Sequence, residues 1–156
     1  YLRLGRSEVP QVLDALDFKI GVAQQLREGD DVTLVSTGSM THQAIEAAKL
    51  LANRRIEARI LHIGTVKPLD EEMPLKDRRQ TRLIVTLEEH SIVGGLGGAV
   101  TELLSESVPA RVLRIGVRDT FAESGHTDQL FEKYGLGVST IVETVKRGLT
   151  HGSSQC

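Results

Sequence analysis

Histidine is the side chain in this sequence best suited to proton transfer or metal binding. The five histidines are spread along the chain, no two of them stand four residues apart, and the single cysteine, Cys156, is the last residue. Protein metal sites usually draw on closely spaced histidines on one helix or on pairs of cysteines. We therefore expect no metal site.

Two histidines stand among glutamates in segments that each follow a predicted strand. Glu88 and Glu89 precede His90 in the first segment, and Glu123 precedes His126 in the second. Ligand sites in parallel sheets form where the carboxyl ends of the strands meet, so the two segments could converge into one polar cluster. A proton-handling site and a hydrogen-bond network at a subunit interface remain equally open interpretations.

A glycine-rich turn, residues 94–98, follows the first of these segments and opens a predicted helix. Such a turn resembles a dinucleotide-binding motif, because the free N–H groups of a helix start can hold an anion. The third glycine of that motif would fall on Val100, however, and two carboxylates, Glu88 and Glu89, would repel a phosphate. We favour a structural role in which the glycines let the helix pack closely on the sheet, and whether the turn binds any ligand stays open.

A second polar turn, Thr37-Gly38-Ser39, precedes another predicted helix. A small anion could bind there, but Ser39 or Thr41 equally suits the N-cap of that helix, which we favour. Ser39 lacks the flanking glycines of a hydrolase nucleophile motif.

Short apolar runs alternate with helical patterns along the chain, which predicts βαβ units. We expect a three-layer α/β/α sandwich with a mostly parallel sheet of about five strands. The predicted strands are residues 20–26, 32–35, 58–63, 83–87 and 112–117. The predicted helices are residues 41–52, 70–79 with an interruption at Pro74, 94–105, 127–134 and 139–149.

Composition excludes several classes of function. The 156 residues fit one domain, with 40% hydrophobic and 26% charged residues. The net charge is -2, from 19 basic and 21 acidic residues scattered along the chain, so nucleic acid is not expected as a partner. No apolar run approaches the roughly 18 residues of a spanning helix, so no membrane partner is expected. The lone cysteine fits a reducing, cytoplasmic setting.

Four motifs in order resemble the C-terminal domain of transketolases. They are residues 3–6, the Lys67-Pro68-Leu69-Asp70-Glu71 loop, residues 88–97, and Ala122-Glu123-Ser124-Gly125 ahead of residues 130–136. The resemblance runs from Tyr1 to about Leu149. Deoxyxylulose phosphate synthases and the β subunits of 2-oxo acid dehydrogenases share this domain. The His90-Ser91 pair is most similar to the transketolase branch, particularly to forms split into two polypeptides.

The resemblance implies a division of the chain and a missing partner. Residues 1–17 are expected to be the end of a preceding pyrimidine-binding domain and its linker, because Tyr1 opens what reads like the middle of an extended segment. Residues 18–150 would form the C-terminal domain, and residues 151–156 a polar tail. The implied partners are the missing N-terminal and pyrimidine-binding domains, in a homodimer.

In this family thiamine diphosphate lies between those two other domains, across a dimer interface. The sequence agrees, since it lacks a Gly-Asp-Gly motif followed by Asn-Asn and has only two tyrosines, three phenylalanines and no tryptophan. We therefore expect no cofactor and no catalytic residue in this chain, with thiamine diphosphate and Mg²⁺ in the full-length enzyme. Arg6 matches a family arginine that holds the sugar phosphate, and a guanidinium suits that role. A surface linker arginine is the alternative.

The leading hypothesis is a dimerisation and support domain of a transketolase that transfers two-carbon ketol units between sugar phosphates. The isolated chain should be inactive. The alternative is a deoxyxylulose phosphate synthase or a 2-oxo acid dehydrogenase β subunit, in which the domain docks a partner or binds a regulatory ligand. A standalone dinucleotide enzyme is the weakest reading. The sequence does not identify the sugar substrates. It also does not show whether the parent enzyme is one polypeptide or two, or whether this chain dimerises alone.

Overall fold

The computed structural model describes residues 1–2, 10–12, 18–72 and 81–150, with five strands and four helices in these ranges. The strands are β1 (Gln24–Arg27), β2 (Val32–Ser36), β3 (Ala58–His62), β4 (Leu83–Ser91) and β5 (Val112–Val117). The helices are α1 (Met40–Ala52), α3 (Leu96–Glu106), α4 (Thr127–Lys133) and α5 (Val138–Thr150).

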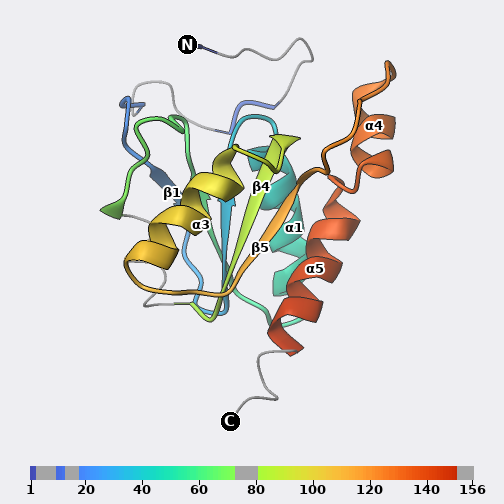
Figure 1. Ribbon diagram of the computed structural model, residues 1–156. Coiled ribbons are helices and arrows are strands. Elements are labelled where there is room, and N and C mark those ends of the chain that lie inside the picture. Colours follow the sequence, from blue (N-terminus) through green and yellow to red (C-terminus); the bar gives the residue numbers. More distant parts are fainter. Residues whose placement is uncertain (3–9, 13–17, 73–80, 151–156) are drawn as a thin grey trace.

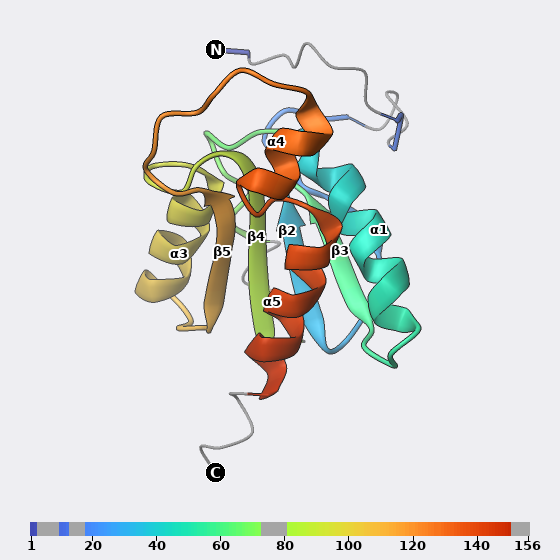
Figure 2. The ribbon, with the colours of Figure 1, turned by 90° about the vertical axis from the view of Figure 1, so that its right-hand side faces the viewer.

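The strands form one sheet in the order β1-β3-β2-β4-β5. The last four pair in parallel, whereas β1 pairs antiparallel with β3 at one edge. Helices α1 and α5 cover one face of this sheet and α3 covers the other (Figures 1 and 2). The predicted three-layer sandwich with a mostly parallel sheet of about five strands is therefore confirmed.

Each face of the sheet carries its own hydrophobic core. Leu34 of β2 packs with Leu51 of α1 and Val145 of α5, while its neighbour Val35 packs with Val100 and other residues of α3. Adjacent residues of a strand point to opposite faces, so a strand covered on both sides needs apolar residues in succession. This explains why β2 reads as a continuous buried run rather than an alternating one.

All the carboxyl ends of the parallel strands point to one edge of the sheet, which we call the carboxyl edge. The loops after β2, β3, β4 and β5 lie there, and so does α4. Because β1 runs in the opposite direction, residues 18–23 that lead into it lie at the same edge. The N-terminus is on this side of the molecule, and α5 ends on the opposite side (Figure 1).

Three predicted boundaries were wrong. Strand β4 continues to Ser91, four residues beyond Leu87, so Glu88, Glu89 and His90 belong to a strand and not to a loop. Helix α3 begins at Leu96 rather than Gly94, because Gly94 has a φ of +72°, outside the helical region.

The strand predicted from residue 20 starts only at Gln24, since Gly21 has a φ of +79° and turns the chain. Most of the helical stretch predicted for residues 70–79 lies outside the described residues.

Candidate functional site at the carboxyl edge

Glu88 is a carboxylate buried inside the molecule, with only 1% of its surface exposed. Its Oε2 accepts the main-chain N–H of Leu96 at 2.8 Å, and its Oε1 accepts that of Gly97 at 2.9 Å. These N–H groups begin α3, where helix geometry leaves them without an intrahelical partner. The chain's own carboxylate thus occupies the position at which a helix start would hold a phosphate.

The glycines of the turn make this contact possible. A Cβ atom on Gly95 would lie 1.9 Å from Glu88 Oε2, and one on Gly97 would lie 2.7 Å from Thr86 Oγ1. Such distances are far below van der Waals contact, so neither position accepts a larger residue without a shift. Close packing of this turn against β4, the role favoured from the sequence, is therefore confirmed for these two glycines.

Ser39 stands at the N-cap position of α1, but its side chain makes no capping hydrogen bond. Its hydroxyl instead donates to the carboxylate of Glu89 in β4. Of the two predicted candidates, Ser39 and Thr41, Ser39 takes the N-cap position, but the predicted side-chain cap is not formed. The contact ties the β2–α1 turn to β4 across the carboxyl edge.

His62 ends β3 and belongs to a buried hydrogen-bond chain that sequence reasoning did not identify. Its Nδ1 lies 2.8 Å from the hydroxyl of Thr41, which lies 3.1 Å from the hydroxyl of Ser36. Burial lowers the pKa of His62 below the usual 6.5, because a charged imidazolium loses hydration inside the protein. In the sequence, only the spacing of Ser36 and Thr41 around a helix start could have indicated this series of hydrogen bonds.

The Lys-Pro-Leu-Asp loop after β3 holds the segment that leads into β1. Thr65 Oγ1 accepts the N–H of Gly21 at 3.0 Å, and Asp70 Oδ2 accepts the N–H of Ala23 at 2.8 Å. This role of Thr65 and Asp70 was not predicted. The loop therefore works as a clamp, which we call the Thr65–Asp70 clamp, on the part of the chain that precedes the sheet.

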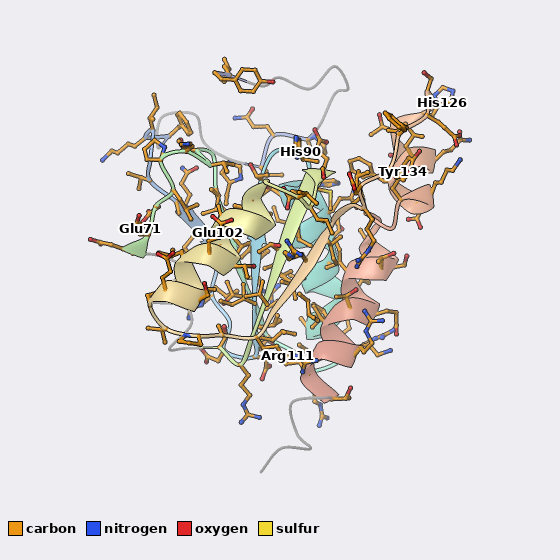
Figure 3. All side chains as sticks on the ribbon, viewed as in Figure 1. Glu71, His90, Glu102, Arg111, His126 and Tyr134 are labelled. Carbon is orange, nitrogen blue, oxygen red and sulfur yellow. The ribbon has the colours of Figure 1, made fainter. Side chains whose placement is uncertain are left out.

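The five residues of the predicted polar cluster are distributed over separate contacts. Glu88 binds the start of α3, whereas Glu123 pairs with Lys133 of α4 at 2.7 Å. His90 Nδ1 lies 3.0 Å from the carbonyl oxygen of Ser91, and His126 is the exposed N-cap residue of α4. Figure 3 shows His90 near the end of β4 and His126 well away from it, beside α4.

Glu89 contacts Ser39, so each glutamate of the predicted cluster is engaged with a different element. The remaining sequence-predicted site residue, Arg6, lies outside the described residues. Among the described residues, no three His, Cys, Asp or Glu side chains gather into a possible metal site. No helix in the described ranges has both the length and the apolar character needed to cross a membrane.

Large apolar side chains are exposed on the segments of the carboxyl edge. Ile20 is 78% exposed ahead of β1, Val93 is 66% exposed after β4, and Phe121 is fully exposed after β5. We call the whole set the carboxyl-edge apolar residues: Phe18, Ile20, Val22, Val66, Val93 and Phe121. Exposed apolar side chains that gather on one part of a surface usually mark an interaction site.

Comparison with known proteins adds the family. The model for the transketolase C-terminal domain matches residues 21–141. A 6-deoxy-6-sulfo-D-fructose transketolase subunit from Clostridium sp. (strain MSTE9) is 46% identical over 143 residues, which are 91% of this chain and 44% of that protein. A 1-deoxy-D-xylulose-5-phosphate synthase from Desulforudis audaxviator is 44% identical over 135 residues, 85% of this chain and 21% of that protein.

Solved structures agree with this relationship. A split-gene transketolase, described as an inactive β4 tetramer, superposes with a TM-score of 0.90 and 46% identity, over 95% of this chain and 49% of that one. Transketolase from Pichia stipitis shares the fold, with a TM-score of 0.62 at 19% identity over 83% of this chain and 18% of that one. The chain spans about half the length, or less, of the relatives it matches. The chain belongs to the transketolase C-terminal domain family.

Proposed function

We propose that this chain is the C-terminal assembly domain of a transketolase that transfers two-carbon ketol units between sugar phosphates. The chain covers 44% of a relative that is named as a transketolase subunit and 49% of a split-gene transketolase chain. The remaining parts of such an enzyme would then hold thiamine diphosphate and Mg²⁺. In this proposal the chain contributes contacts within a homodimer rather than catalytic groups.

The observation that carries this proposal is the chemistry of the carboxyl edge. Open α/β sheets usually bind their ligands there. In this chain, the N–H groups of Leu96 and Gly97 are already bonded to Glu88, so the start of α3 does not offer them to a phosphate. The same edge exposes Ile20, Phe121 and other apolar side chains. A surface of this kind is suited to contact with another folded domain.

Arg6 is the one residue that we propose for substrate contact. It lies in the part of the sequence that the family resemblance assigns to the preceding domain, whereas the Thr65–Asp70 clamp fixes residues 21–23. The guanidinium of Arg6 would bind the phosphate of a sugar substrate through paired, charge-assisted hydrogen bonds.

A second candidate function follows from the similarity to 1-deoxy-D-xylulose-5-phosphate synthase at 44% identity. In that case the same domain would support the formation of 1-deoxy-D-xylulose-5-phosphate. A 2-oxo acid dehydrogenase β subunit, with the carboxyl edge docking a further enzyme of the complex, is the remaining alternative.

An activity assay separates these candidates. The chain is assayed alone and together with the catalytic domains of its parent enzyme, with thiamine diphosphate and Mg²⁺ present. We expect transfer of a two-carbon unit from a ketose phosphate to an aldose phosphate only when the catalytic domains are present. Formation of 1-deoxy-D-xylulose-5-phosphate instead would favour the second candidate. Ketol transfer by the chain alone would contradict the assembly role.

A further inference from the structure

A hollow of about 210 Å³ lies beside the open edge of β5, between this strand, the turn after α4 and the helix α5. Arg114 and Arg118 line it from the strand side, and Arg147 lines it from α5. Within the described part of the chain, its lining contains these three arginines and no carboxylate. A cationic hollow without a counter-charge attracts anions.

Several arginines elsewhere on the surface are already paired with carboxylates. Arg27 pairs with Glu57 at 2.9 Å, and Arg59 lies 3.2 Å from a carboxylate oxygen of Glu28. Arg118 and Arg147, by contrast, make no ion pair or side-chain hydrogen bond with any described residue. Both guanidinium groups are therefore available to a ligand.

Arg114 has a partner already, since its Nη1 donates to the carbonyl oxygen of Ile92 at 3.1 Å. This bond uses one of the five N–H groups of the guanidinium, so Arg114 adds positive charge near the hollow but is less free to reorient than Arg118 and Arg147. The main-chain N–H of Arg114 has a different role from its side chain. The carbonyl oxygens of Arg111 and Val117 accept the N–H groups of Ile84 in β4 and of Ile92 just after it, so the main-chain polar groups of the odd-numbered residues of β5 point toward β4. Because the direction alternates along a strand, the N–H groups of Arg114 and Gly116 face the open edge.

Neutral donors complete the lining. Thr140 and Thr144 line the hollow from α5, and Tyr134 lines it from the C-cap position after α4. The Tyr134 oxygen accepts the N–H of Glu123 at 3.0 Å, which leaves its own hydrogen free to donate. Two unpaired guanidinium groups, edge N–H groups and hydroxyls together match the acceptor oxygens of a phosphate.

A second hollow of about 420 Å³ continues from the first along α5 and shares Thr140, Thr144 and Arg147 with it. Its further lining is Ser139 and Glu143. Glu143 pairs with Lys146 at 2.7 Å, so this carboxylate is largely balanced by a neighbouring cation. A hydroxyl and a carboxylate here are suited to a ligand body that carries hydroxyl groups.

We propose that this groove binds a small phosphate monoester, with the phosphate in the hollow beside β5 and a hydroxyl-bearing body along α5. The site uses none of the carboxyl-edge apolar residues and no residue assigned to substrate contact. It is therefore a ligand site separate from the proposed function. Ligand binding at this site can be measured without knowing the activity of the whole enzyme.

The proposal is tested by calorimetric titration of the full 156-residue chain with inorganic phosphate and with glycerol 3-phosphate at constant ionic strength. Both should bind, and glycerol 3-phosphate more tightly, because its hydroxyls reach Ser139. Arg118→Gln and Arg147→Gln should each raise the Kd about ten- to a hundredfold, the effect of losing one charge-assisted hydrogen bond. Arg82→Gln, which removes an exposed arginine outside the groove, is the matched control.

Three results would overturn the assignment. The first is the absence of any binding heat with both ligands at millimolar concentration. The second is an equal loss of affinity in Arg82→Gln and Arg118→Gln, which would show general charge attraction. The third is an equal affinity for inorganic phosphate and glycerol 3-phosphate, which would contradict the proposal that the ligand is a phosphate monoester. Circular dichroism of each variant checks that the fold is intact, and a variant that unfolds is replaced by Arg118→Lys, which keeps the charge and should lose the paired hydrogen bonds.

Discussion

Asp70 Oδ2 accepts the main-chain N–H of Ala23 at 2.8 Å, although the two residues stand 47 positions apart in the sequence. The bond joins the loop after β3 to the segment that leads into β1. It thereby fixes the backbone next to Ile20 and Val22, whose side chains are exposed. The position of these apolar residues thus depends on the loop after β3.

Asp70→Ala should release the segment leading into β1 while the sheet stays folded. The loss of one such hydrogen bond is worth about 1 kcal/mol, so the Ala23 amide should exchange its hydrogen several-fold faster. Glu71→Ala is the matched control, because Glu71 is the exposed neighbour of Asp70 (Figure 3). Native-state hydrogen exchange measures both variants. Unchanged protection of Ala23 in Asp70→Ala would show that Thr65 holds the segment by itself.

Glu88→Gln should destabilise the domain although it changes only one atom of a buried side chain. An amide offers one acceptor oxygen where Leu96 and Gly97 supply two donors, so one buried N–H is left facing an NH₂ group. We expect the free energy of unfolding to fall by about 1.5 to 3 kcal/mol. Urea denaturation gives this value. Glu102→Gln, the same change on the exposed side of α3, should alter it by less than about 0.5 kcal/mol.

His62 should make the stability of the domain depend on pH. Its pKa in the folded protein is lowered by burial, so below about pH 6.5 the unfolded chain takes up a proton that the folded chain does not. The free energy of unfolding should therefore fall as the pH falls below 6.5, until the lower folded pKa is reached. In His62→Gln this part of the dependence should disappear. If the wild type and His62→Gln show the same dependence of the free energy of unfolding on pH, His62 is not the group that causes it.

The fold could be predicted because strands covered on both faces leave a distinctive pattern. Val32 to Val35 are all buried, and a run of this kind followed by a helical pattern has few structural interpretations. The antiparallel direction of β1 could not be read in the same way, since three of its four residues are only partly buried and Gln25 is exposed.

The site was harder to predict because polar residues were assumed to lie in loops. Glu88 sits in a strand and is buried, and this is tolerated only because two N–H donors meet its carboxylate. A glutamate eight residues ahead of a glycine-rich helix start is the signal that could have revealed the contact. The separation of His90 from His126 depends on loop conformation, which residue types alone do not determine.

Arg6 should act on substrate binding in the intact enzyme, if it holds the sugar phosphate as proposed. Arg6→Ala should raise KM for phosphorylated sugars about ten- to a hundredfold and lower kcat less, because the phosphate is remote from the bond that breaks. Arg3→Ala, in the same segment, is the control variant. Sugars without a phosphate should react with the same kcat/KM in the wild type, Arg6→Ala and Arg3→Ala. Equal losses of kcat/KM with and without the phosphate would assign Arg6 a structural role.

The central claim is that the carboxyl edge is an assembly surface, and the mass of the assembled enzyme tests it most directly. Ile20→Ser combined with Phe121→Ser removes two highly exposed apolar side chains from this edge without touching the core. Leu50→Ser, on the outer side of α1, is the matched control. Light scattering of each variant together with the catalytic domains should show partial dissociation only for the double variant, with a parallel loss of ketol transfer. An unchanged mass and activity in the double variant would contradict the account.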